Sequence, residues 1–391
     1  MSDHKLAPWP FYADDEIAAV ARVLKSGGVN YWTGDEGRQF ETEYAASCNV
    51  KHGLTVANGT LALELALYGL GIGDGAEVIV PARTFVATAS AVAARGGIPV
   101  VADIDPASQN ITAETMAAAL SPHTKAVIVV HLAGWPVDMD PILSLARKHG
   151  LSVIEDCAQA HGAMHRGRPV GGIGDVGCFS FCQDKIITTG GEGGMVVTSD
   201  TAAYKKMWAY RDHGKDYDLT AAPSNGLDYR WLVSRFGANW RLTEPQSAIG
   251  RLQLKKLPQW VERRRANAAA LNDALADLNV VTLAHPPAHA FHSYYKYYFR
   301  LQIDGLKTDW DRNRVCAELD ALGVPARMGT CPDISKEAAF AHAGFTKHPP
   351  HPNAARIADE VMMLPVHPTL TPGHVAFMAD TTQKILRQAT R

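Results

Sequence analysis

The amino-acid sequence predicts an α/β protein whose mostly parallel sheet is covered by helices, followed by a smaller C-terminal α+β domain. Three observations lead to this prediction. Short runs rich in valine and isoleucine recur in the first half of the chain, helix-length segments separate several of them, and the alternation changes beyond about residue 260. Strands that are apolar throughout are typical of parallel sheets covered on both faces.

Six apolar runs are predicted to be the strands of this sheet. Turn residues or carboxylates bound most of them. The simplest interpretation of their side chains is a buried core, which we adopt. In chain order the predicted strands are residues 76–81, 98–105, 124–134, 151–160, 176–181 and 193–200.

Helices are predicted between several of these strands and at the end of the first domain. Residues 111–122 and 139–150 have helical length, and Gly150 is a natural stop for the second. Thr243 and Gln246 have the spacing of a capping box. A long helix is therefore predicted to begin there and to continue through residues 258–278.

The chain is predicted to divide into a large domain, residues 1–260, and a small C-terminal domain, residues 261–391. Within the second part, residues 293–303 are strand-like, residues 309–323 are helical, and the proline- and histidine-rich residues 347–353 form a loop.

The composition is that of an ordinary soluble protein. The 391 residues are 47% hydrophobic and 20% charged, and the net charge of −2 gives no reason to expect nucleic acid or an anionic membrane as partner. No apolar stretch reaches the roughly 18–20 residues of a membrane span, and the N-terminus lacks a signal-peptide core. We therefore expect a cytoplasmic protein whose six cysteines are reduced thiols. Cys178 and Cys182 have no second matched pair for zinc, so no metal is expected.

The stretch FSFCQDKIITTGGEGGM, residues 179–195, places Lys185 before a run of glycines. In a nucleotide P-loop the lysine follows the glycines, and the glycine spacing here does not match the dinucleotide fingerprint either. The glycines are instead predicted to let the backbone turn tightly before strand 193–200. Lys185 therefore needs another explanation.

Chemically useful side chains follow the predicted strands, at the edge where an open parallel sheet binds ligands. Each has an ordinary reading when taken alone: a helix cap, a turn, a satisfied hydroxyl, a solvated lysine or a core ring. Together they meet the requirements of pyridoxal 5′-phosphate (PLP). A helix start with a hydroxyl suits a phosphate, a buried aspartate keeps a pyridine nitrogen protonated, a lysine forms an imine, and a ring stacks on a flat heterocycle. The residues are Gly59, Thr60, Phe85, Asp156, Gln159, Ser180 and Lys185.

Several blocks of the sequence, in the same order, resemble the DegT/StrS-type sugar aminotransferases. These are a branch of the fold-type I, aspartate-aminotransferase-like PLP enzymes. The similarity extends over most of the chain, through VANGTLALELAL, RTFVATASAV, EDCAQAHGA, GCFSFCQDKIITTGGEGGMVVT and GANWRLTEPQSAIGRLQLKKL. The resemblance implies the fold-type I architecture and PLP as cofactor.

Carried over to this sequence, the resemblance implies that Lys185 attaches the cofactor covalently and then moves the proton of the reaction. Asp156 pairs with the pyridine nitrogen, Gln159 lies beside the ring oxygen, and Phe85 stacks on the ring. The phosphate is bound by Gly59, Thr60 and Ser180, and by Asn239 of the neighbouring subunit, which implies a homodimer with shared active sites.

The resemblance further implies amino transfer to a keto-sugar, most simply a nucleotide-linked 3-keto or 4-keto sugar, with glutamate as amino donor. The product is expected to serve a surface polysaccharide or a glycosylated natural product. Relatives with histidine at the lysine position are sugar 3-dehydratases, so Lys185 favours amino transfer. Alternatives are an aminotransferase for a keto-cyclitol and a non-catalytic PLP-binding regulator, although the chain has no added basic DNA-binding segment.

Some residues depart from the family pattern and concern the substrate. Gln183 and Asp184 stand where many relatives have less polar residues, and residues 327–340 differ from the expected sugar-facing loop. Residues 31–33 lie in a stretch that lines the substrate side in relatives. The sequence leaves the function of these segments open.

Overall fold

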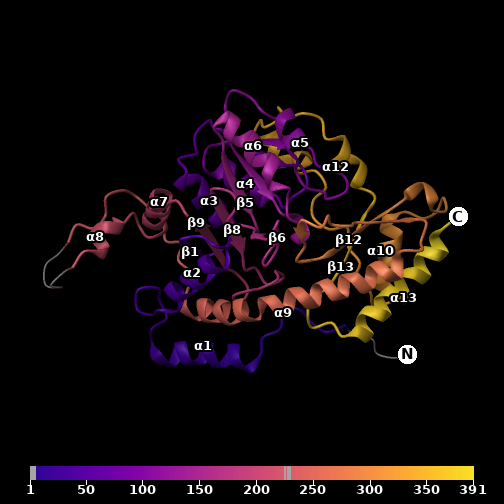
Figure 1. Ribbon diagram of the computed structural model, residues 1–391, viewed down its shortest axis with the longest axis horizontal. Coiled ribbons are helices and arrows are strands. Elements are labelled where there is room, and N and C mark those ends of the chain that lie inside the picture. The colour runs from indigo at the N-terminus through magenta and orange to yellow at the C-terminus, as the bar shows by residue number, and fades with distance from the viewer. Residues whose placement is uncertain (1–5, 224–225, 227–229) are drawn as a thin grey trace.

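The computed structural model describes residues 6–223, 226 and 230–391. A sheet-containing body occupies most of the molecule, and the long helix α9 (Glu244–Leu275) runs along it to a C-terminal part (Figure 1). No helix among these residues is long and apolar enough to cross a membrane.

The central sheet has seven strands in the order β1-β9-β8-β5-β4-β2-β3. Neighbours pair in parallel from β8 to β3, whereas β9 is antiparallel to both β1 and β8. All six predicted strands are in this sheet, and β1, which was not predicted, is short and contains a glycine and two polar residues. The strands are β1 (His52–Val56), β2 (Glu77–Pro81), β3 (Ile98–Ala102), β4 (Thr124–Val130), β5 (Ser152–Asp156), β8 (Val176–Ser180) and β9 (Gly194–Thr198).

Helices cover both faces of the sheet, as predicted. Side chains alternate along β2, so that Val78 and Val80 pack toward one set of helices and Ile79 toward the other. On the first face lie α3 (Gly59–Gly69), α4 (Ala87–Ala94) and α7 (Thr201–Arg211). On the second lie α5 (Ala113–Ala118), α6 (Met139–His149), α2 (Glu36–Ser47) and α9.

Helix α9 begins with the predicted capping box of Thr243 and Gln246 and continues for 32 residues. It crosses residue 260, where we placed the division between domains, so both parts of the chain share one continuous helix. From Ala268 onward its buried side chains belong to the C-terminal core. The domain division itself stays a prediction.

The C-terminal core surrounds a small antiparallel sheet in the order β10-β12-β13. Its strands are β10 (Val281–Leu283), β12 (Tyr297–Leu301) and β13 (Val361–Leu364), packed against α10 (Arg312–Ala321) and α13 (Pro372–Ala389). The predicted strand and helix of this part are thus present but shorter, and the last two residues of the predicted loop begin α12 (Pro352–Ile357).

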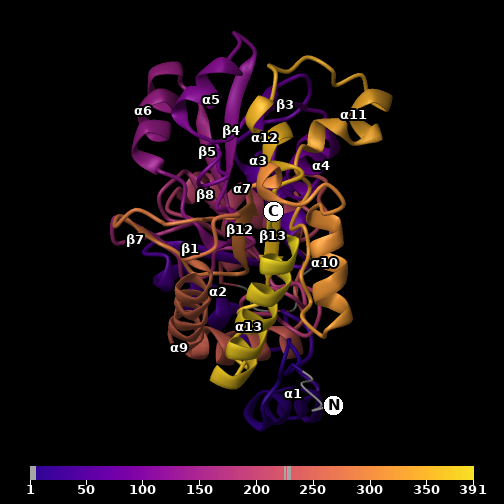
Figure 2. The same ribbon diagram turned by 90° about the vertical axis from the view of Figure 1, so that its right-hand side faces the viewer.

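Residues 334–361 leave this core and pack on the large sheet. Ile334, Phe340 and Ile357 share a buried cluster with strands β2 and β3. Figure 2 shows α12 near β3, with α11 (Ala338–His342) beside it. The remaining short elements are α8 (Tyr217–Ala221), β6 (Met164–His165), β7 (Arg168–Pro169), β11 (Ala290–Phe291) and the 3-10 turns Leu132–Gly134, Ile303–Gly305 and Ile334–Lys336.

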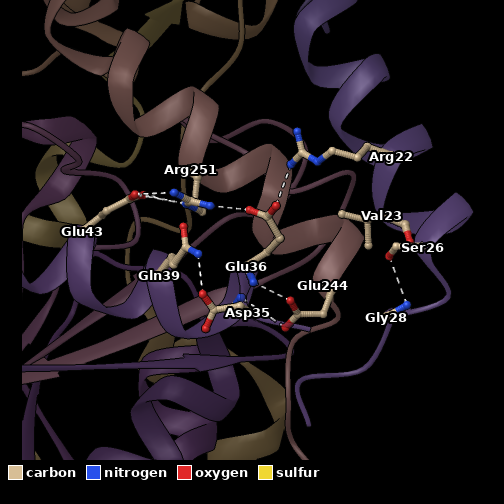
Figure 3. A network of polar contacts seen from close by, with 11 residues as sticks. Arg22, Val23, Ser26, Gly28, Asp35, Glu36, Gln39, Glu43, Glu244 and Arg251 are labelled. Atoms are coloured by element: carbon tan, nitrogen blue, oxygen red, sulfur yellow. Dashed lines mark hydrogen bonds and ion pairs between the residues drawn. The ribbon is translucent and has the colours of Figure 1, made fainter. Parts of the chain in front are cut away.

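A network of ion pairs attaches the N-terminal helix α1 (Asp14–Ser26) and α2 to α9 (Figure 3). Arg251 of α9 donates hydrogen bonds to Glu43 and to Glu36, both on α2. Arg22 of α1 donates to the other carboxylate oxygen of Glu36 at 2.6 Å. Glu244 accepts from two backbone N–H groups at the start of α2, so charges of both signs are matched here.

Candidate active site

The start of helix α3 meets the end of strand β8. A Cβ atom added at Gly59 would lie 2.6 Å from the Cβ atom of Ser180, so only glycine allows this approach. Asn58 caps α3 by accepting a hydrogen bond from the backbone N–H of Leu61 at 2.9 Å. The first N–H groups of α3, together with Gly59, Thr60 and the Ser180 hydroxyl, therefore form one polar corner.

Asp156 ends β5, in the strand beside β8, and its side chain is buried. It accepts hydrogen bonds from the Thr88 hydroxyl at 2.9 Å and from the backbone N–H of Ala158 at 3.1 Å. Burial raises the pKa of Asp156 above its usual value, although these hydrogen bonds and the charge of Lys185 oppose the rise. A cation placed beside this carboxylate would therefore be bound strongly.

Thr88 is a site residue that the sequence reasoning missed. It lies four residues after Thr84, and the two hydroxyls are 2.9 Å apart in α4 and the turn before it. The helical spacing of two threonines in RTFVAT was the available signal, because residues four apart share one face.

Gln159 comes shortly after Asp156 in the sequence, and its side chain is also buried. Its carbonyl oxygen accepts a hydrogen bond from the backbone N–H of Ala133 at 2.8 Å. This bond leaves the amide NH₂ group of Gln159 as the part that can donate to a ligand.

Lys185 follows β8 at the edge of the site, with its side chain 16% exposed. Its ammonium lies 3.8 Å from a carboxylate oxygen of Asp184 and 4.9 Å from the ring centre of Tyr295. The Tyr295 hydroxyl donates to the other carboxylate oxygen of Asp184. The indole N–H of Trp9 donates to the backbone carbonyl of Lys185 at 3.0 Å. Asp184 thus holds both the lysine and the tyrosine.

The turn after Lys185 is fixed by glycines and by α9. Gly190 and Gly191 have φ values of 85° and 121°, which confirms that this run turns the backbone before β9. The amide oxygen of Gln253 on α9 accepts from the backbone N–H of Thr188 at 2.8 Å. Gln183 is exposed and takes no part in this arrangement through its side chain.

Two buried residues next to the site, His161 and Glu155, hold its backbone in place through hydrogen bonds. His161 donates from Nε2 to the Ser180 carbonyl at 2.9 Å and accepts at Nδ1 from the Tyr44 hydroxyl at 2.7 Å. Burial lowers the pKa of His161 to about 3, so the ring is neutral. Glu155 has a carboxylate that accepts from His131 at 3.0 Å and from backbone N–H groups, so it is structural.

Phe85 and Asn239 lie at the surface of the single chain. The Phe85 side chain is 64% exposed in the turn between β2 and α4. Asn239 is exposed, and its side chain has no hydrogen-bond partner among the described residues. The next residue, Trp240, accepts at its carbonyl from the N–H of Ala57, just before α3.

The segments whose function the sequence leaves open lie in two different parts of the structure. Residues 327–340 adjoin the end of β2, where the N–H of Ile334 donates to the Ala82 carbonyl at 2.9 Å. Tyr31 instead lies in a buried ion network, where its hydroxyl donates to Glu41 at 2.9 Å and Arg211 lies over its ring at 4.3 Å.

The residues fit PLP, the cofactor that the sequence predicts. The polar corner at α3 suits its phosphate, and the buried carboxylate of Asp156 suits a protonated ring nitrogen. Lys185 is a partly buried amine, as covalent attachment requires. The exposed ring of Phe85 is free to stack on a heterocycle.

Comparisons with known proteins agree over nearly the whole chain. The family model described as the DegT/DnrJ/EryC1/StrS aminotransferase family matches residues 11–383. The crystal structure of an aminotransferase from Psychrobacter cryohalolentis has a TM-score of 0.96 and 46% sequence identity, covering 98% of this chain and 99% of that one.

Three curated relatives have names that specify a reaction. GDP-perosamine synthase of Caulobacter vibrioides is 42% identical over 76% of this chain and 77% of its own length. The UDP-N-acetyl-3-dehydro-alpha-D-glucosamine 3-aminotransferase of Acidithiobacillus ferrooxidans is 37% identical over 95% and 94%. The L-glutamine:2-deoxy-scyllo-inosose aminotransferase of Streptoalloteichus tenebrarius is 38% identical over 76% and 72%.

These matches confirm the predicted family, the fold and the dependence on PLP. The chain belongs to the DegT/DnrJ/EryC1/StrS aminotransferase family and is a PLP-dependent aminotransferase.

Proposed function

We propose that the protein transfers an amino group from glutamate to the ketone carbon of a nucleotide-linked keto-sugar, at C3 or C4. The observation that carries the proposal is that a partly buried Lys185, which follows β8, lies close enough for its charge to act on the buried carboxylate of Asp156 at the end of the neighbouring strand β5. The names of two relatives, one a GDP-sugar and one a UDP-sugar enzyme, support a nucleotide-linked substrate.

The residues divide the work between binding and proton transfer. Bound PLP supplies a carbonyl carbon that exchanges amines and a ring that withdraws electrons. Asp156 holds the proton on the ring nitrogen, and Thr88 orients its carboxylate. Lys185 Nζ takes the proton from the donor's α-carbon and later delivers a proton to the substrate carbon. Asp184 keeps this amine in place through its contact at 3.8 Å.

Other residues bind the cofactor and orient it. Gly59, Thr60 and Ser180 bind the phosphate at the start of α3, where the helix dipole favours an anion. Gln159 donates its amide N–H to the ring oxygen, and Phe85 stacks on the ring face.

We further propose a homodimer in which Asn239 reaches the phosphate in the other subunit's site. The segment before Asn239 exposes large apolar side chains: Trp231 is 85% exposed, Val233 57% and Phe236 98%. An exposed apolar group of this size indicates a protein interface. Size-exclusion chromatography with light scattering gives the mass, and a monomer would contradict this proposal.

The direct test is the Lys185→Ala variant. It is expected to lose the cofactor's absorbance and all measurable turnover, because no other amine replaces Lys185 in the turn after β8. Circular dichroism should show an unchanged fold. If the variant kept the wild-type cofactor spectrum, Lys185 would not be the attachment point.

A keto-cyclitol is the second candidate substrate, because a relative at 38% identity is named for 2-deoxy-scyllo-inosose. Assays with a panel of nucleotide-linked keto-sugars and keto-inositols separate the two candidates. Faster turnover of the inosose would overturn the nucleotide-sugar proposal and leave amino transfer intact. Glutamate and glutamine should be compared as donors in the same assays.

A further inference from the structure

Cationic side chains gather around the ring of Tyr295, next to the site. The ammonium of Lys296 lies 4.8 Å from the ring centre, and that of Lys185 lies 4.9 Å from it. Arg264 of α9 donates to the Tyr295 backbone carbonyl at 3.1 Å. Tyr295 comes just before β12, so the C-terminal part of the chain supplies this wall of the site.

The anion nearest to this group is already engaged. Asp184 accepts the hydroxyl proton of Tyr295 and lies 3.8 Å from Lys185. Arg264 is fully buried against backbone carbonyls and the Trp9 ring, which leaves it unable to reach a ligand. Of these three cations, Lys296 is therefore the one that no carboxylate or carbonyl contacts among the described residues.

Lys296 has no hydrogen bond or ion pair among the described residues, and its ammonium lies over the Tyr295 ring. Lys296 is half-buried, and burial lowers its pKa to about 8, with Arg264 and Lys185 acting in the same direction and Asp184 in the opposite one. A desolvated charge without a counter-ion is unfavourable, and a bound anion would relieve this cost.

Lys205 shows the usual arrangement for comparison. It also lies over a tyrosine, 5.4 Å from the ring centre of Tyr217, but its ammonium bonds Asp218 at 2.6 Å. Lys296 lies over a ring in the same way but bonds no carboxylate among the described residues, so an external carboxylate would complete the same arrangement.

We propose that Lys296 binds a carboxylate of a substrate whose reacting carbon lies at Lys185. The two ammonium groups lie 4.9 Å and 4.8 Å from one ring centre, so they are at most about 10 Å apart, a span that a substrate with its reacting carbon at Lys185 and a carboxylate several bonds away could bridge. The phosphate-binding corner lies elsewhere, at the start of α3. The inference rests on the proposed amino transfer and names the group that recognises one of its substrates.

A carboxylate has two possible sources in this reaction. One is the amino donor, since glutamate carries a second carboxylate beyond its α-carbon. The other is a keto-sugar that bears a carboxylate of its own. The chemistry at Lys296 is the same, a charge-assisted hydrogen bond from an ammonium to a carboxylate.

The test compares Lys296→Met and Lys296→Arg with wild-type holoenzyme, and uses Lys205→Met as the matched control. The first arm measures the conversion of the cofactor's absorbance by glutamate and by alanine, which lacks the second carboxylate. The second arm measures turnover of keto-sugars with and without a carboxylate. Isothermal titration with glutarate, which has both carboxylates but no amine, reports binding apart from activity.

We expect Lys296→Met to weaken the interaction with the carboxylate-bearing partner about 10- to 100-fold, as for loss of one charged hydrogen bond. Lys296→Arg should restore much of it, and Lys205→Met should match wild type. A loss with glutamate and glutarate but not alanine identifies the donor. A loss confined to the carboxylate-bearing sugar identifies the sugar.

Unchanged glutarate affinity together with unchanged kinetics in both arms would overturn the proposal, provided that the variant keeps its cofactor spectrum. A wild-type protein that exchanges amines with no donor would instead contradict the proposed function. In that case the glutarate titration still decides whether Lys296 binds a carboxylate.

Discussion

Two arginines on helix α9 have opposite surroundings. Arg251 donates to Glu43 and to Glu36, and these hydrogen bonds hold its pKa above the usual value (Figure 3). Arg264, further along the same helix, is fully buried, and its carbonyl partners are Tyr294 and Tyr295. Burial lowers the pKa of Arg264 to about 9.

The surroundings of the two arginines differ in charge balance. Arg251 lies in a region that supports the fold, and Arg264 lies next to the proposed ligand-binding site. Around Arg251 the charges are balanced by neighbouring side chains before any ligand arrives. Around Arg264 and Lys296 positive charge is in excess, and two side-chain nitrogens of Arg264 have no hydrogen-bond partner among the described residues. An excess of buried positive charge destabilises the fold, and at Lys296, the member of the pair that a ligand can reach, a bound anion would relieve this cost, as proposed above.

The largest effect is expected from breaking a balanced and buried pair. Glu41→Gln leaves the guanidinium of Arg211, bonded at 2.6 Å in the wild type, without its counter-charge. Removing one partner of such a pair costs about 3–5 kcal/mol in the free energy of unfolding. Urea denaturation measures the loss. Glu43→Gln, at the more exposed partner of Arg251, is the control and should cost below about 1 kcal/mol; equal losses would contradict the distinction.

On the ligand-binding side, Asp156→Asn is expected to retain cofactor but to lower turnover about 100-fold, equivalent to about 2.7 kcal/mol in the barrier. In the proposed mechanism the carboxylate would stabilise the protonated ring nitrogen, and a neutral amide would not. Steady-state rates and the cofactor spectrum measure the two effects separately. A wild-type rate in this variant would argue against the pyridinium role.

Acid should destabilise the fold through buried histidines that are neutral in the folded state. Burial lowers the pKa values of His161 and His292 to about 3, whereas the unfolded chain titrates near 6.5. Between these values the unfolded state binds more protons, so stability is lost as pH falls from 6.5 toward 3. At pH 5 each histidine contributes a loss of about 2 kcal/mol.

This acid effect is best measured by urea denaturation of the cofactor-free protein at pH 7 and pH 5. His292→Phe should reduce the difference between the two pH values, since it removes one titrating ring. Burial raises the pKa of Asp156, which acts in the opposite direction over the same range. Equal stability of wild type at both pH values would show that these rings are not kept neutral by burial.

The smallest effect is expected at Arg264 itself. Arg264→Met removes an unbalanced charge as well as two hydrogen bonds, so its unfolding free energy should change by less than about 1 kcal/mol. Arg251→Met removes matched pairs at a partly exposed position and should cost about 1 kcal/mol. Thermal denaturation ranks the two variants, and a larger loss for Arg264→Met would reverse the comparison drawn above.

Much of the fold could be predicted from local patterns. The six apolar runs became strands because short runs rich in valine, isoleucine and other apolar residues suit a sheet that is covered on both faces. Asp156 and Ser180 were placed together because the ends of parallel strands meet at one edge, and β5 and β8 are indeed neighbours.

The wall formed by Tyr295 and Lys296 could not be predicted in this way. Alternation along SYYKYY predicts which side chains share a face, but not which distant segment they meet. Lys185 and Tyr295 are brought together by packing between the two parts of the chain. The same limit applies to Thr88, whose partner Asp156 is 68 residues away in the sequence.

The continuity of α9 makes the site intolerant of changes in chain length. Gln253 binds the turn after Lys185, and Arg264 binds the wall at Tyr295, so one stretch of helix sets the spacing between them. Inserting a single residue between these two positions would rotate Arg264 by about 100° and advance it by about 1.5 Å relative to Gln253. We therefore expect insertions and deletions to fall in loops. The length of α9 between Gln253 and Arg264 sets the distance between the turn after Lys185 and the segment at Tyr295.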